Sequence, residues 1–138
     1  MRPPDELKKE LVLQWVAKAS RDFELAQHLL KEEAPYSEAI CFHAQQAAEK
    51  YLKAFLTWHQ IEFPKTHNVG KLLRLIATIE PELAESLRGA HALTAYGVDL
   101  RYPDDLLQVT PKHAESAVEL AASVREAIGR LLDPFIRD

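Results

Sequence analysis

Two basic side chains, a threonine and a histidine lie close together in the middle of the chain. Lys65, Thr66 and His67 come just before an expected short helix, and Lys71 follows one turn later. The free backbone N–H groups in the first turn of a helix attract anions. Lys65 and His67 are therefore candidates for binding a nucleotide phosphate. The alternative is structural, with Thr66 capping the helix and His67 hydrogen-bonded to an adjacent helix.

A second polar group lies on the otherwise apolar stretch 36–59 and consists of Gln45, Gln46, Lys50 and Lys53. Glu49 precedes Lys53 by four residues, in the order that favours an intrahelical salt bridge. This polar strip could line a groove, with Lys53 near a phosphate, or a seam between two copies of the chain. The alternative is a strip of solvated side chains.

The other reactive residue types do not form a recognisable site. The histidines lack the spacing of three or four residues on one helix that a metal site needs, so we expect no metal ion. The chain has no Gly-rich phosphate loop, no serine elbow and no carboxylate dyad, and we expect no cofactor. Cys41 is the only cysteine, which excludes an internal disulfide and favours a reducing cytoplasm.

Length and composition fit one soluble domain over residues 1–138, because 47% of the residues are hydrophobic and 28% are charged. The formal net charge of -4 means that affinity for nucleic acid must come from a local basic patch. No apolar stretch is long enough to cross a membrane, and the first residues lack the apolar core of a secretion signal. We therefore expect no membrane interaction.

The positions of prolines and apolar residues predict an all-α fold. The stretch 36–59 has no Gly or Pro and carries a broad apolar band, so it should be the central helix, with Ser37 as its N-cap. Thr66 should cap the third helix, and Pro81 should open a fourth that continues to about Leu100. We expect an up-and-down bundle of about five helices built on a long antiparallel helix hairpin. These helices cover residues 4–33, 36–59, 66–79, 81–100 and 110–134.

Three segments in this order resemble the HEPN domain family. They are the Ala-rich helix HAQQAAEKYLKAFL, the segment FPKTHNVGKLL and a helix ending in LRYPD, followed by a last Ala-rich helix. The resemblance covers about residues 20–131. It implies a helical bundle that forms a homodimer and is encoded next to a small nucleotidyltransferase, as a toxin–antitoxin or nucleotide-handling pair.

Many members of that family are metal-independent ribonucleases with an Arg followed after four to six residues by a His. In such a site the imidazole transfers a proton and the guanidinium holds the phosphate. Arg101 occupies the position of the family's Arg, beside Tyr102, but the window for the His holds Leu106, Leu107 and Gln108. The next histidine is His113, beyond Pro111.

Two alternatives remain open for these residues. Arg101 could neutralise the C-terminal end of the fourth helix or pair with a nearby Asp. A second Arg–His match, from Arg21 to His28, falls within the first helix and away from the family's site.

Three functions remain for the chain. The first is a HEPN-like binding module that partners a nucleotidyltransferase and holds a nucleotide or RNA phosphate near Arg101, Tyr102, Lys53, Lys65 and His67. The second is a ribonuclease whose catalytic candidates are Arg101 and His113. The third is a purely structural protein-interaction bundle.

Overall fold

A computed structural model describes residues 4–32, 36–97 and 109–136, and these residues form helices and connecting segments without a β-strand. The all-α prediction is confirmed. The elements are α1 (Pro4–Leu30), α2 (Ser37–Trp58), α3 (Val69–Ala77), α4 (Pro81–Ser86), the 3₁₀-helix η1 (Arg88–Tyr96) and α5 (Pro111–Ile136).

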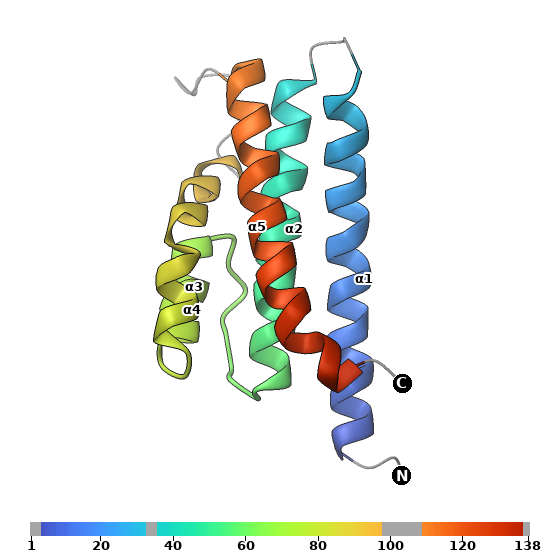
Figure 1. The fold of residues 1–138 in the computed structure, drawn as a ribbon, viewed down its shortest axis with the longest axis vertical. Helices are drawn as coiled ribbons and strands as arrows, with labels where there is room; N and C mark the ends of the chain where they lie inside the picture. Colours follow the sequence, from blue (N-terminus) through green and yellow to red (C-terminus); the bar gives the residue numbers. More distant parts are fainter. Residues whose placement is uncertain (1–3, 33–35, 98–108, 137–138) are drawn as a thin grey trace.

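The three long helices α1, α2 and α5 lie side by side, and α1 runs antiparallel to α2 (Figure 1). The short elements α3, α4 and η1 form a second group beside them, and α3 and η1 pack against α2 (Figure 1). Helix α2 therefore contacts α1, α3, η1 and α5, which confirms its prediction as the central helix.

The core follows from the apolar pattern of the sequence. On α1, Val12, Ala19, Phe23 and Ala26 are at most 1% exposed and face α2 and α5. The alanines of α2 allow the neighbouring helices to approach closely. The fully covered alanines of α2 are Ala44, Ala47, Ala48 and Ala54.

The predicted fourth helix is wrong in extent. Helix α4 stops at Ser86, and the chain continues as the 3₁₀-helix η1. A 3₁₀-helix has three residues per turn, so Leu87, Ala90 and Leu93 share one face, and all three are buried. Leu100 lies outside the described residues. The spacing of three between Leu87, Ala90 and Leu93 therefore fits a 3₁₀-helix, whereas an α-helix was expected here.

Two predicted caps and the predicted end of the first helix also differ from the structure. Ser37 is the first residue of α2 and not its cap. The cap of α3 is Asn68, whose side-chain oxygen accepts a hydrogen bond from the Lys71 backbone N–H at 3.0 Å. Helix α1 ends at Leu30, short of the expected 33.

Helix α5 begins at Pro111 as expected but continues through Pro134 to Ile136. The last turn is held in place because Phe135 stacks against Trp58, with 4.8 Å between ring centroids. None of the helices in the described ranges is long and apolar enough to span a membrane.

Candidate functional site

The buried carboxylate of Glu49, in the middle of α2, collects four side-chain contacts. Its Oε1 accepts a hydrogen bond from Lys53 Nζ at 2.7 Å. Its Oε2 lies 3.1 Å from His67 Nδ1 and 3.3 Å from the amide nitrogens of Gln45 and Gln46. Spacings of three and four along α2 bring Gln45, Gln46 and Lys53 to Glu49. We refer to these five residues as the Glu49 cluster.

Most of the Glu49 cluster is buried. Gln45 is 0% exposed, Glu49 is 2% exposed and Lys53 is 7% exposed. The interpretation of this strip as solvated is therefore wrong for Gln45 and Lys53. Buried charges persist in proteins when they are paired and hydrogen-bonded, and the predicted Glu49–Lys53 salt bridge provides this pairing.

Lys53 points toward two aromatic rings as well as toward Glu49. Its Nζ lies 5.5 Å from the ring centroid of Trp15 on α1 and 5.8 Å from that of Phe63, in the segment between α2 and α3. These distances allow cation–π attraction. The ammonium group is therefore engaged on three sides by the protein.

His67 lies just before α3 and not within its first turn, because Asn68 is the N-cap. Its backbone carbonyl accepts a hydrogen bond from Gln45 Nε2 at 2.8 Å, and its ring contacts Glu49. A carboxylate can only accept, so Nδ1 of His67 carries a proton, and in the neutral form of the ring Nε2 keeps its lone pair. The His67 side chain is 46% exposed, which leaves part of the ring open to solvent.

Gly97, at the end of η1, lies directly against His67. A β-carbon at Gly97 would lie 3.0 Å from the His67 β-carbon and 3.3 Å from the Gln45 side-chain amide. The absence of a side chain at this position therefore permits the close approach. The chain continues from Gly97 into the segment with Arg101 and Tyr102, both of which lie outside the described residues.

Two other predicted site residues are exposed. Lys65 lies on the surface of the segment before α3. His113 lies in the first turn of α5, where its Nδ1 accepts a hydrogen bond from the Thr110 backbone N–H at 3.0 Å. The neutral ring therefore has its proton on Nε2, and in this arrangement it can donate a hydrogen bond but has no free lone pair to accept a proton.

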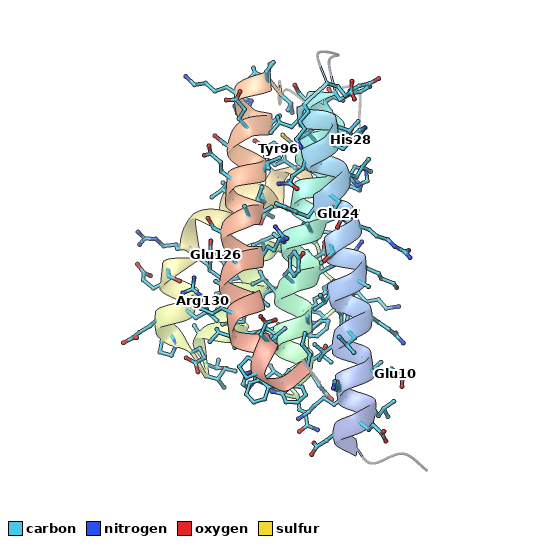
Figure 2. The ribbon with its side chains drawn as sticks, turned by 45° about the vertical axis from the view of Figure 1, so that its right-hand side comes forward. Glu10, Glu24, His28, Tyr96, Glu126 and Arg130 are labelled. Carbon is cyan, nitrogen blue, oxygen red and sulfur yellow. The ribbon has the colours of Figure 1, made fainter. Side chains whose placement is uncertain are left out.

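A further polar group, which was not expected from the sequence, joins α1 to α2. Asp22 on α1 accepts from Lys50 Nζ at 2.5 Å and contacts His43 Nδ1 at 2.9 Å, both on α2. These partners are 21 and 28 residues apart along the chain, so no local spacing could have revealed them. His28 of the Arg21–His28 match lies near the end of α1 (Figure 2), where its Nε2 is 3.6 Å from Glu32 Oε1.

Cys41 lies one turn before Gln45 on α2 and is fully buried. Burial raises the pKa of its thiol to about 11, and a hydrogen bond with Tyr96 partly opposes this shift. Burial also raises the pKa of Tyr96, and the contact with Cys41 adds to the effect. Cys41 thus behaves as a small core residue with an unreactive, protonated thiol.

Within the described ranges, no group of three or more His, Cys, Asp or Glu side chains could hold a metal ion. The side chains of the Glu49 cluster can form hydrogen bonds and ion pairs, and the His67 ring can also transfer a proton.

Comparison with known families agrees with this arrangement of helices. The sequence model of the HEPN domain matches residues 12–131, which is most of the chain. The chain belongs to the HEPN domain family. No curated protein and no solved structure matches it. The HEPN match spans both the Glu49 cluster and the RYPD segment, so the segments that suggested the family from sequence lie within it.

Proposed function

We propose that this HEPN protein is a cytoplasmic binding module without catalytic activity of its own. It forms a homodimer and acts with a small nucleotidyltransferase, in a toxin–antitoxin or nucleotide-handling pair. Its ligand is the phosphate of a nucleotide or an RNA. The ligand site combines Lys65 and His67 with Arg101 and Tyr102.

The observation that carries this proposal is the contact between Gly97 and His67. Gly97 precedes the RYPD segment by only a few residues, and its backbone lies against the His67 side chain. The end of η1 and the segment before α3, which are far apart in the sequence, therefore lie against each other here. The exposed Lys65 provides the positive charge and the hydrogen-bond donors that a phosphate requires, and the half-exposed His67 ring adds a donor at Nε2 when both of its nitrogens carry a proton.

In our proposal Lys53 does not contact the ligand, and it supports the site indirectly through its ion pair with Glu49. Its ammonium group is buried and paired with Glu49, so its charge is already neutralised. Glu49 in turn fixes the His67 ring. A buried partner that orients an exposed histidine is a common device in ligand sites.

A ribonuclease is the second candidate function. Within this candidate, the Glu49–His67 contact favours His67 as the general base in place of His113, the residue expected from sequence. His113 has its Nδ1 lone pair occupied by Thr110, whereas His67 keeps the Nε2 lone pair that a general base needs. In this version His67 takes the proton from the ribose 2′-OH and Arg101 holds the phosphate.

Fluorescence anisotropy with a labelled single-stranded RNA and thermal shifts with ATP test the binding proposal. We expect His67→Ala, Lys65→Ala and Arg101→Ala each to weaken binding at least several-fold, whereas Lys18→Ala on α1 serves as an exposed control. A ligand that binds the folded state must raise its stability. Unchanged binding in all three variants would contradict the proposed site.

RNA cleavage in the presence of EDTA separates the two functions. Binding without cleavage supports the non-catalytic module. Cleavage by the wild type that is lost in both His67→Ala and Arg101→Ala, but kept in His113→Ala, establishes the ribonuclease instead. The matched His113→Ala variant is informative because the two histidines differ in which ring nitrogen is free.

A further inference from the structure

A hollow of about 300 Å³ lies along the seam between α3 and the α4–η1 segment, with lining residues separate from the Glu49 cluster. Leu73 of α3 and Ala84 of α4 are only 6% and 9% exposed and form part of its lining together with Ala77 and Pro81. The floor is therefore apolar. A volume of this size is at the lower end of the range for small-molecule sites.

The rim of this hollow is basic although the chain as a whole has a net charge of -4. Arg74 comes from α3 and Arg88 from η1, so the two guanidinium groups belong to different elements. Arg88 pairs with Glu85 at 3.2 Å, whereas no acidic side chain of the described residues pairs with Arg74. The rim thus carries one uncompensated positive charge.

His91 closes one end of the hollow and is fitted against the backbone of α3. A β-carbon at Gly70 would lie 2.2 Å from His91 Nδ1 and 2.6 Å from its Cε1. A side chain at residue 70 would therefore displace the exposed His91 ring from this position. The imidazole is therefore held in a notch beside the apolar floor, where it adds a hydrogen-bonding group.

We propose that this hollow binds a small amphipathic anion, with a flat apolar body on the Leu73–Ala84 floor and an anionic group held by Arg74. A guanidinium fork matches the two oxygens of a carboxylate or a phosphate. Burial of an apolar ring against this floor is favourable because it removes apolar surface from water. A free inorganic ion has no such ring and gains nothing from the floor. This site is independent of the function proposed above.

The dye 8-anilinonaphthalene-1-sulfonate tests the proposal, because it combines an apolar double ring with an anionic group. Its fluorescence on titration should show one saturable site on the full chain. Arg74→Ala should weaken binding about tenfold, since a hydrogen bond to a charged group is lost. Gly70→Ala should also weaken it by displacing His91. The matched control is Arg130→Ala, which removes an exposed Arg that pairs with Glu126 on α5 (Figure 2).

Competition against the dye identifies the source of the anion. Displacement by AMP indicates a nucleotide, and displacement by indole-3-acetate indicates an aromatic carboxylate; either result supports the proposal. Inorganic phosphate that displaces the dye as well as these ligands would overturn the role of the apolar floor. Dye binding that is unchanged in Arg74→Ala, or displaced by none of the three, would overturn the site itself. Arg74 is exposed, so its replacement should leave the fold intact, which circular dichroism verifies.

Discussion

At the scale of single residues, Glu49 has four side-chain polar contacts, of which three are with residues of α2 and one is with His67 in the segment before α3. It neutralises Lys53, orients His67 and accepts from two glutamine amides. Every buried side-chain nitrogen and oxygen of the described residues has a hydrogen-bond partner. Such a network is sensitive to substitution, because the loss of one member leaves the others buried and unpaired.

Replacement of Glu49 by Gln should therefore be strongly destabilising. The change keeps the shape of the side chain but leaves the Lys53 ammonium buried without a counter-charge, at a cost of about 3 kcal/mol. Urea unfolding measures the loss. Glu126→Gln is the control, since the Glu126–Arg130 pair has the same spacing but side chains 74% and 73% exposed, and should cost at most about 0.5 kcal/mol. Equal losses in the two variants would contradict a structural role for Glu49.

The pKa of Cys41 leads to a prediction about pH. Burial raises this pKa from 9.0 to about 11, so the folded state holds the thiol proton more tightly than the unfolded state. The resulting stability is fully present below pH 9 and is lost as pH rises toward 11. The free energy of unfolding in urea should therefore fall more between pH 8 and pH 10.5 for the wild type than for Cys41→Ser, because a serine hydroxyl does not ionise in this range while all other groups are shared. Parallel pH profiles would contradict this cause.

The residues of the site could be predicted from sequence only where their partners are close along the chain. The Glu49–Lys53 pair follows from a spacing of four, and the cluster of Lys65 with His67 is visible directly. The contact of Glu49 with His67 spans 18 residues, and that of Asp22 with Lys50 spans 28. Both depend on how helices pack, which no local pattern specifies.

At the level of elements, the three long helices, the presence of α3 and the start of α4 at Pro81 could be predicted, whereas the end of α4 and the 3₁₀-helix η1 could not. Helices α1, α2 and α5 carry sustained apolar stripes over at least six turns. In contrast, η1 is set by tertiary packing, which buries Leu87, Ala90 and Leu93 at a spacing of three. The start of α3 was also ambiguous, because Thr66 and Asn68 are both good caps.

The start of α3 provides a test at this level. Asn68→Ala removes the oxygen that accepts from the Lys71 N–H and should cost about 1 kcal/mol of stability. Thr66→Ala removes only the hydroxyl that accepts from the Asn68 N–H at 3.1 Å and should cost less. Chemical denaturation of the two variants ranks them. A larger loss of stability in Thr66→Ala than in Asn68→Ala would indicate that Thr66 is the cap.

At the scale of the whole molecule, one face of α1 exposes several large apolar side chains to solvent. Leu7, Leu11 and Leu25 are 45%, 43% and 40% exposed. Leu7 and Leu11 are one turn apart, and Leu25 follows Leu11 after about four turns, so all three share one side of the helix. Exposed apolar groups arranged in this way often mark a protein interface.

The homodimer that we propose should therefore depend on this face of α1. Burial of each leucine contributes about 2 kcal/mol to association, so Leu11→Glu combined with Leu25→Glu should weaken the dimer about a hundredfold or more. Sedimentation velocity of the wild type and of this variant measures the change, with Leu131→Glu as the control because Leu131 is a 39% exposed leucine on α5. A variant that remains dimeric places the interface elsewhere on the bundle, whereas a wild type that sediments as a monomer contradicts the homodimer itself.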